Sequence, residues 1–582
     1  MSLIDKIKSL KKPNAPWEHF YTKEERKLVI PDDTLYDVLA KSAEEYPLYY
    51  AYSYYGTKVT YREMLNMVEK AVCAFRSHGI RRGDVVSLCL PNVPEALISL
   101  YALNRIGAIS EMIHPLSSEV EIKNYLNNTG SVMLIMVDFC YEKVKNILQD
   151  TKVYKSIYVS PKESMPFLTS LGYEVTKGFK IEKPSKDDSS CLMWSTFIKS
   201  GKRYRQDFES MTVNTDPAVI LHSGGTTGNP KSIVLSSRNF NALVEQAKML
   251  LKDVVPGDTI LGVLPIFHGF GLGVTIHCAM SKGVEIQLIP QFDAKKFDKI
   301  LSKDRPNLIL GVPTLFEAMT NIDDKNLDLS YIKCVICGGD SLNQNLIDKV
   351  NKYLKDHKGR TRICQGYGMT ECLGPVCVGI KDITNKDLSM GIPFPGNYLK
   401  IIDPETLNEM PIGEAGEICV SGPTVMMGYL DNEKETNEIL RIHSDGRVWL
   451  HTGDMGYMTE EGIFYYQQRI KRMIISSGFN VYPSQIESVI CEHPAVLNCT
   501  VVAIPHPYKQ QVAKAFVVLK QGYSPNIFVK NSIKEHCKKH LSKFSIPYEY
   551  EFRKSLPKTL IGKVDFKKLQ EEEDLKHKKE NR

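Results

Sequence analysis

The chain has 582 residues, of which 43% are apolar and 24% charged, and its formal net charge at pH 7 is +6. This composition is typical of a soluble globular protein with room for more than one domain, and the small net charge excludes the strongly basic face of a nucleic-acid-binding protein. The first residues carry scattered lysines and no apolar core, so we expect no secretory signal, and no uncharged apolar run reaches the roughly 20 residues of a membrane span.

The first part of the chain alternates helical and strand-like patterns. Thr60 begins a capping box, and apolar residues then recur at helical spacing as far as Gly79. A strand-like run follows at 83–91 and a helical one at 94–105. Further strand-like runs lie at 284–290, 307–313 and 332–339. This alternation predicts an α/β fold whose large N-terminal domain is built of layered, largely parallel sheets with helices.

The pattern changes near 467–482. Short strand candidates lie at 497–505 and 513–520, and a helix is expected at 531–544. These elements predict a small α+β domain of about the last hundred residues. The charge run at 571–582 is typical of a frayed, solvated tail.

The 14 cysteines are spread over the chain without the spacing of a disulfide framework. We therefore expect free thiols and a cytoplasmic protein. Cys334 and Cys337 are three residues apart in a strand-like run, so their side chains point to opposite faces. They are interpreted as core cysteines and not as a metal or redox pair.

The stretch L-H-S-G-G-T-T-G-N-P-K-S at 221–232 combines glycines, hydroxyl groups and a lysine after an apolar run. Glycines let backbone N–H groups turn inward and hydroxyls add donors, so this stretch is suited to phosphate groups. The P-loop of NTPases has its lysine directly after the last glycine, whereas two residues intervene here. The predicted phosphate contacts are Ser223, Gly224, Gly225, Thr226, Thr227, Gly228 and Lys231.

Further motifs follow in order. They are L-P-I-F-H-G-F-G-L-G at 264–273, C-G-G-D-S-L at 337–342, Q-G-Y-G-M-T-E at 365–371, H-T-G-D at 451–454, R-I-K-R-M-I-I-S-S-G-F-N-V-Y-P-S-Q-I-E at 469–487 and P-K-T-L-I-G-K at 557–563. Together with the 223–231 loop, this series resembles the adenylate-forming superfamily of acyl-CoA synthetases, adenylation domains and luciferases. The segments at 17–26 and 114–130 look most like its fatty-acyl-CoA synthetase branch.

The resemblance implies a two-step reaction that uses ATP, Mg²⁺ and coenzyme A. A carboxylate attacks the α-phosphate of ATP to give an acyl-adenylate and pyrophosphate, and a thiol then displaces AMP. It implies that Thr370 contacts the α-phosphate and that Glu371 binds Mg²⁺. The adenine would stack on Tyr367 in a site that also includes Gly338, Gly339 and Gly368.

The resemblance also assigns the ribose. Asp454 would accept hydrogen bonds from its hydroxyl groups, and Arg469 would make a second contact with ribose or phosphate. The chain departs from the family pattern immediately before this arginine, because Gln468 stands where the family usually has a glycine.

Three residues near the C-terminus would divide the two reaction steps between them. Lys563 would bridge the substrate carboxylate and the α-phosphate during adenylation. Lys471 matches the family's hinge, about which the small domain rotates, and Gly478 would then face the pantetheine thiol. This implies a large domain at 1–468 and a small domain at 469–582, with the hinge near 469–471.

By the same resemblance His268 stands at a gate beside the acyl site, whose wall includes Gly269, Phe270, Gly338, Gly339 and Gly366. So many glycines leave an apolar cavity with room for an acyl chain or an aromatic ring. The leading hypothesis is a medium- or long-chain fatty acyl-CoA synthetase. An enzyme that loads a carrier-protein pantetheine, an aryl-acid CoA ligase, a luciferase-type oxygenase, a P-loop NTPase and a non-catalytic sensor are the alternatives. The basic N-terminus allows weak peripheral contact with a membrane.

Overall fold

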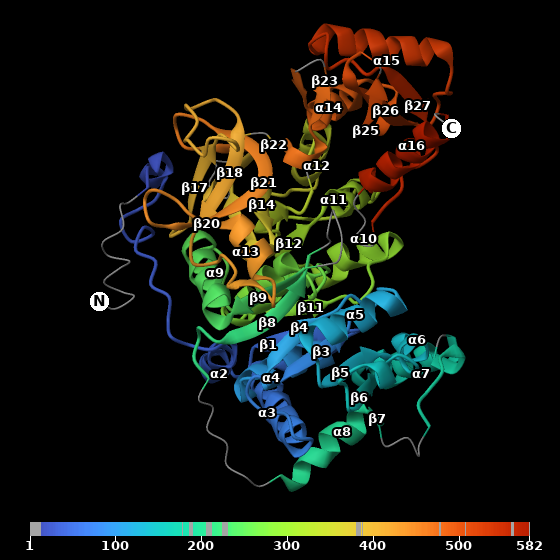
Figure 1. The fold of residues 1–582 in the computed structure, drawn as a ribbon. Helices are drawn as coiled ribbons and strands as arrows, with labels where there is room; N and C mark the ends of the chain where they lie inside the picture. Colours follow the sequence, from blue (N-terminus) through green and yellow to red (C-terminus); the bar gives the residue numbers. More distant parts are fainter. Residues whose placement is uncertain are drawn as a thin grey trace.

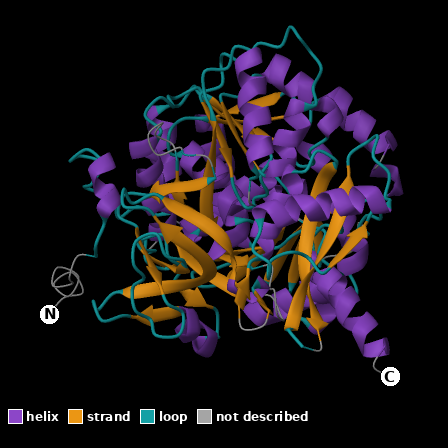
Figure 2. Cartoon of the chain, turned by 90° about the horizontal axis from the view of Figure 1, so that it is seen from above, coloured by secondary structure: helices purple, strands orange, loops and turns teal. Residues whose placement is uncertain are grey.

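Three β-sheets and the helices that flank them form the protein (Figures 1 and 2). The computed structural model describes residues 13–176, 178–185, 190–204, 212–223, 231–340, 342–379, 386, 388–476, 479–506, 508–559 and 564–580. No helix in these ranges is both long and apolar enough to cross a membrane.

An eight-stranded sheet has the strand order β19-β9-β8-β4-β3-β5-β6-β7. Its strands from β8 to β7 are parallel, whereas β9 is antiparallel to both of its neighbours. The bounds are β3 Val85–Cys89, β4 Ile109–Met112, β5 Met133–Val137, β6 Lys155–Val159, β7 Cys191–Met193, β8 Pro217–His222, β9 Ser232–Ser236 and β19 Gly428–Tyr429.

A fourteen-stranded sheet has a parallel half and an antiparallel half. The parallel strands are β1 Tyr50–Tyr54, β10 Thr259–Gly262, β11 Glu285–Leu288, β12 Leu308–Gly311, β13 Cys334–Cys337 and β14 Ile363–Met369, with β2 Thr57–Thr60 added antiparallel at the edge. The antiparallel half comprises β15 Gly374–Val378, β16 Ser389–Pro393, β17 Tyr398–Ile402, β18 Gly416–Ser421, β20 Leu440–Ile442, β21 Val448–Met458 and β22 Phe464–Arg469. The two halves meet at β14.

Helices flank these sheets. They are α2 Leu35–Glu45, α3 Tyr61–Ser77, α4 Pro94–Ile106, α5 Glu119–Thr129, α6 Tyr141–Val144, α7 Phe167–Thr176, α8 Trp194–Ser200, α9 Ser237–Leu250, α10 Phe297–Lys299, α11 Pro313–Thr320, α12 Gln344–Asp356 and α13 Glu433–Ile439. The capping box predicted for α3 is present, because Thr60 and Glu63 each accept the other's backbone N–H. Helix α4 is buried almost all round, as its continuous apolar sequence requires.

The C-terminal part contains its own five-stranded sheet. The strands are β23 Ile474–Ser476, β24 Phe479–Val481, β25 Val496–His506, β26 Gln510–Leu519 and β27 Glu549–Phe552, and the helices are α14 Pro483–Glu492, α15 Ile527–His540 and α16 Phe566–Glu580. A separate apolar cluster that includes Ile486, Val501 and Ala515 forms its core. Figure 1 shows this part, in orange to red, beside α11 and α12. The α/β layers and the small C-terminal sheet confirm the predicted fold class.

Two boundary predictions were wrong. Helix α15 begins earlier and ends earlier than 531–544, because the Asn526 side chain caps its N-terminus by accepting from the Val529 N–H. The predicted frayed tail is instead helix α16, from Phe566 to Glu580. Its Glu573 is 3% exposed and forms an ion pair with Lys514 at 2.8 Å, so partners on β26 stabilise part of the charge run.

The cysteine prediction is confirmed. All 14 cysteines are free thiols, and most are buried. Cys334 and Cys337 lie on the buried strand β13, at its first and last positions. They are core residues.

Candidate functional site

The predicted phosphate loop connects two antiparallel strands, β8 and β9. At its neck the Ser223 N–H donates to the Lys231 carbonyl at 3.0 Å, and the Lys231 N–H lies 3.4 Å from the Ser223 hydroxyl oxygen. These two contacts bring the ends of the loop together. Gly224, Gly225, Thr226, Thr227 and Gly228 lie outside the described residues.

A buried histidine–carboxylate contact lies at the start of this neck, and no sequence pattern indicated it. His222 Nε2 is 3.0 Å from the carboxylate of Glu111, which also accepts hydrogen bonds from Ser87 and Thr129. The Tyr125 ring stacks on His222 with centroids 4.0 Å apart. These contacts fix the last residue of β8, from which the loop begins.

Lys231 and Glu371, which are distant in sequence, approach the same tyrosine. The Tyr429 hydroxyl donates to Glu371 Oε1 at 3.0 Å, and Lys231 Nζ lies 4.8 Å from the centroid of the Tyr429 ring. Lys231 also pairs with Glu435 at 2.8 Å. Burial, followed by the charge of Glu371, raises the pKa of Tyr429, so its hydroxyl remains a donor. Tyr429 was missed because no motif at 422–430 signalled it.

The carboxyl end of β14 positions Thr370 and Glu371. Strand β14 ends at Met369, and a single 3₁₀ turn follows at Thr370–Cys372. Gly368 is required here, because a Cβ atom would overlap the carbonyl oxygen of Gly374 on β15. The two strands can therefore approach closely, and this approach fixes the turn that carries Glu371.

Asp454, the carboxylate of the predicted ribose site, is buried. The Tyr367 hydroxyl donates to its Oδ2 at 2.9 Å, and Arg469, its partner across the β21–β22 ladder, places Nε 2.9 Å from Oδ1. The Arg469 contact is an ion pair whose geometry is not that of a hydrogen bond. Oδ1 is buried, and it has no hydrogen-bond donor among the described residues. Burial raises the pKa of Asp454 and the charge of Arg469 partly offsets the rise. A buried acceptor of this kind can take a ligand hydroxyl.

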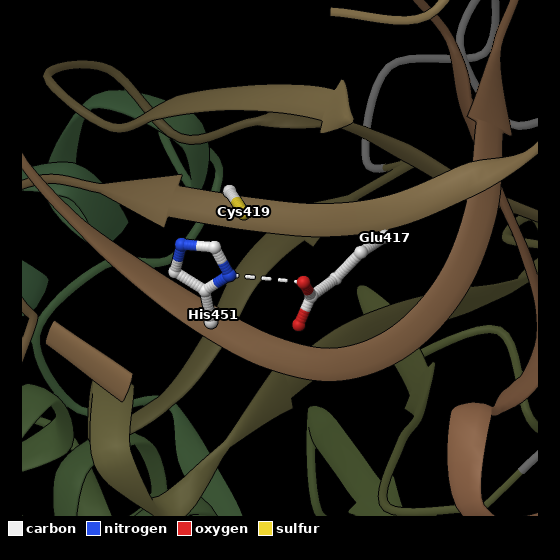
Figure 3. A group of neighbouring side chains, drawn as sticks. All are labelled: Glu417, Cys419 and His451. Atoms are coloured by element: carbon white, nitrogen blue, oxygen red, sulfur yellow. Dashed lines mark hydrogen bonds and ion pairs between the residues drawn. The ribbon is translucent and has the colours of Figure 1, made fainter. Parts of the chain in front are cut away.

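The segment of β21 before Asp454 is anchored by the neighbouring strand β18 (Figure 3). The Thr452 hydroxyl donates to the Ile418 carbonyl at 2.7 Å and accepts from the Asp454 N–H at 3.1 Å. Gly453 has φ +68, a conformation that glycine adopts without strain, and its N–H donates to Glu417 at 2.9 Å. Glu417 was not among the predicted site residues.

The predicted acyl-site residues lie close together. A Cβ on Gly338 would lie 3.0 Å from the Phe270 ring and 3.6 Å from the Gly366 carbonyl oxygen. A Cβ on Gly269 would lie 3.0 Å from Leu373, in the turn that follows Glu371. His268 immediately precedes Gly269 in the chain. Gly339 immediately follows Gly338 and has φ +80. Phe270 begins a π-helix, Phe270–Cys278, which the sequence did not predict and which is often found at functional sites.

Residues with C-terminal roles are only partly placed. Lys563 and Gly478 lie outside the described residues. Lys471 is exposed in a 3₁₀ turn at Ile470–Arg472. Arg472, next to it, is anchored to the C-terminal part through Glu487 on α14 at 2.5 Å and the Val501 carbonyl on β25 at 3.2 Å.

The donor set at Glu371 is compatible with a magnesium ion. Its carboxylate is buried, and among the described residues its side-chain hydrogen bond comes from the neutral Tyr429 hydroxyl. Asp454 lies close enough that, in addition to burial, the charge of Glu371 raises its pKa. Hard oxygen ligands and an adjacent triphosphate are what Mg²⁺ requires.

Comparison with known proteins gives a consistent result. The AMP-binding enzyme family matches residues 39–430, and the AMP-binding enzyme C-terminal domain matches 485–563. A long-chain-fatty-acid–CoA ligase of Bacillus subtilis is 32% identical over 97% of this chain and 99% of its own length. The structure resembles a long-chain-fatty-acid-CoA ligase from Archaeoglobus fulgidus, with TM-score 0.67, 25% identity and coverage of 90% and 98%. It shares its fold with an anthranilate CoA ligase, with TM-score 0.78, 21% identity and coverage of 93% and 97%.

Proposed function

The chain belongs to the AMP-binding enzyme family, and from this premise we propose that it is an ATP-dependent, AMP-forming ligase that joins a long-chain fatty acid to coenzyme A. The observation that carries the proposal is the buried carboxylate of Asp454. Its Oδ2 accepts from Tyr367, whereas its Oδ1, which is paired with Arg469, has no aligned donor in the described chain. A nucleotide ribose would supply the missing hydroxyl donors.

In the first step a carboxylate oxygen of the acid attacks the α-phosphorus, and the bond to the β-phosphate oxygen breaks to release pyrophosphate. The 223–231 loop would hold the β- and γ-phosphates. Lys231 would leave Glu435 and pair with these phosphates. Thr370 would donate to the α-phosphate from the turn after β14. Glu371 would hold Mg²⁺, which when bound neutralises phosphate charge. Lys563 would lie between the two anionic reactants.

In the second step the coenzyme A thiol attacks the acyl carbon and AMP leaves. We propose that residues 469–582 rotate between the steps, about a hinge at Ile470–Lys471. Arg469 is paired with Asp454 in the preceding part, whereas Arg472 is bound to Glu487 on helix α14 of the C-terminal part. Contacts therefore change from one part to the other within three residues, which supports a pivot there. Gly478 would then approach the thiol.

The proposed acid is long and apolar. The wall formed by Phe270, Gly338 and Gly366 carries no charged side chain, and the Bacillus subtilis relative is a long-chain-fatty-acid–CoA ligase. Each buried CH₂ contributes about 0.8 kcal/mol, which is enough to favour long chains over short ones. We place the enzyme in the cytoplasm, which its free thiols support, with weak peripheral contact to membranes.

The test is a pyrophosphate-release assay over a panel of acids, with and without coenzyme A. We expect AMP and pyrophosphate as products, highest turnover with long-chain fatty acids and thioester formation that depends on free coenzyme A. Turnover only with a carrier protein, or only with aryl acids, would replace the proposed acceptor or acid. ADP as product would refute the proposal as a whole.

A further inference from the structure

Helix α7 turns its apolar side toward solvent. From Phe167 to Thr176 none of its residues is buried. The exposed fractions of its large apolar residues are 81% at Phe167, 80% at Leu168, 55% at Leu171 and 64% at Val175. Figure 1 shows α7, in teal, at the outer edge of the molecule. A surface helix ordinarily directs such residues toward the core, so this exposure is unusual.

These residues form one continuous stripe. With 3.6 residues per turn, Leu171, Val175 and Leu168 lie roughly 40°, 80° and 100° around the helix from Phe167. Phe179 is 65% exposed in the 3₁₀ turn Gly178–Lys180, which contacts α7 and continues the stripe. We call these five residues the α7 face. Five large apolar side chains gathered in this way are a patch, in contrast to single exposed residues scattered over a surface.

Polar contacts hold α7 in this orientation. Tyr173 lies on the side of the helix opposite the α7 face, and its hydroxyl donates to Asp138 Oδ2 at 2.8 Å. Asp138 is 1% exposed and also accepts from the Ser160 hydroxyl at 3.2 Å. A rotation of the helix that buried the apolar stripe would break the contact with Tyr173. The outward apolar face is therefore part of the folded arrangement.

Positive charge lies along the edge of the α7 face. Glu174 is the only charged residue of α7, and its two oxygens lie 2.6 Å from Lys162 Nζ and 2.5 Å from Lys183 Nζ. One carboxylate is thus shared by two ammonium groups. Lys180 is exposed at the end of the face. Glu182, the next acid along the chain, is itself paired with a lysine at 2.6 Å. The edge therefore complements an anionic surface.

The size and openness of the α7 face favour a lipid bilayer over a protein partner. Large apolar side chains cover roughly 150–250 Å² each, so the exposed fractions amount to roughly 600 Å². This is smaller than the roughly 800 Å² that each partner of a stable protein complex buries. A Cβ added to Gly172, beside the stripe, would meet no atom of the described chain within 4 Å, so the face has no wall there. A bilayer needs no complementary shape.

We propose that the α7 face inserts into the headgroup region of a membrane that contains anionic lipids. The apolar side chains enter the boundary between headgroups and acyl chains, and Lys162, Lys180 and Lys183 extend along it to the phosphate groups. The inference does not rest on the proposed function, although a ligase for long-chain fatty acids would reach acids dissolved in the bilayer by this contact.

The experiment measures sedimentation of the full chain with vesicles of phosphatidylcholine, with or without phosphatidylglycerol. We expect binding to the mixed vesicles that weakens as salt is added, and weaker binding to phosphatidylcholine alone. Phe167→Glu combined with Leu171→Glu should lower the partition coefficient by roughly tenfold or more. Phe528→Glu is the matched control, because Phe528 is also 81% exposed and lies on α15. It should bind as wild type does, and neither variant should change Tm, since all three positions are exposed.

A fluorescent reporter locates the contact directly. The native tryptophans at 17, 194 and 449 are 2%, 7% and 0% exposed, so Phe167→Trp adds the exposed indole. Its emission should shift to shorter wavelength when mixed vesicles are added.

Three results would overturn the proposal. The first is wild-type protein that does not sediment with mixed vesicles, and the second is a folded double variant that binds them as wild type does. The third is a chain that forms dimers without lipid and loses them in the double variant, which would assign the α7 face to a second copy.

Discussion

Asp454→Asn isolates the charge of the proposed ribose acceptor, because asparagine has nearly the same shape. With its amide oxygen facing Tyr367, its NH₂ group would occupy the position of Oδ1 and face Arg469 Nε, 2.9 Å from that oxygen in the wild type. A donor would then stand where the ribose hydroxyls need an acceptor. A hydrogen bond to a charged group contributes about 1.5–3 kcal/mol, so we expect kcat/KM for ATP to fall roughly 10- to 150-fold.

Stability separates this loss from misfolding. Asp454 is 2% exposed and burial raises its pKa above the ordinary value. An acid with a raised folded-state pKa loses stability as pH rises through its unfolded pKa, and the ionised group is the costly form at neutral pH. The uncharged variant lacks that cost, so its Tm at pH 7 should not fall through loss of the charge.

The assay is pyrophosphate release with ATP varied at saturating acid, together with thermal unfolding of each variant. Asp445→Asn is the matched control. Asp445 lies just before β21 and accepts the Trp449 indole N–H, so the same change is made away from the proposed ribose site. An Asp454→Asn enzyme that is folded and retains wild-type kcat/KM for ATP would refute the ribose assignment.

Three further predictions test other parts of the molecule. Burial raises the pKa of Glu95 from 4.5 to about 7. As pH rises from below 4.5 to above 7, the wild type should therefore lose about 3 kcal/mol of unfolding free energy relative to Glu95→Gln. Urea unfolding measures this difference, and parallel pH profiles of the two proteins would contradict it. Gly368→Ala would overlap the Gly374 carbonyl, so activity should fall together with about 1–3 kcal/mol of stability, and a variant as stable and active as wild type would contradict the close approach. Lys563→Ala should slow adenylation by roughly two to three orders of magnitude while thioester formation from supplied acyl-AMP persists, and normal adenylation would show that the role is wrong.

The elements that could be predicted from the sequence are those whose signals lie within their own residues. Helix α3 carries its own capping box and apolar spacing, and β13 carries a short buried run. Helix α16 could not be predicted in this way, because its charge run resembles a solvated tail. Its place depends on Lys514 of β26, which pairs with Glu573 of the helix, and on Leu569, which belongs to the buried apolar cluster of Phe516 and Val518 on the same strand.

The same distinction applies to the site. Residues in glycine-rich motifs were found because close backbone approach leaves a sequence signature, as Gly368 and Gly338 show. Tyr429 and Glu417 were missed because a tyrosine or glutamate in a strand is common, and only the folded chain shows that they contact Glu371 and Gly453. Sequence separations of 58 and 36 residues join these pairs. The antiparallel half of the large sheet was missed for a similar reason, since its pairings are set by tertiary packing.

The acids of the site are arranged at a cost to the unliganded protein. Asp454 is buried with one oxygen lacking an aligned donor, and Glu371 is buried with a neutral hydroxyl as its side-chain partner. Arg469 offsets part of this cost at Asp454, and a ligand's hydroxyl donors or a cation would offset more of it. Nucleotide binding would supply such partners, and the folded protein would then be stabilised according to the affinity and concentration of the nucleotide. The carboxylates that are costly to bury are therefore the same groups that would make the site selective for a magnesium nucleotide.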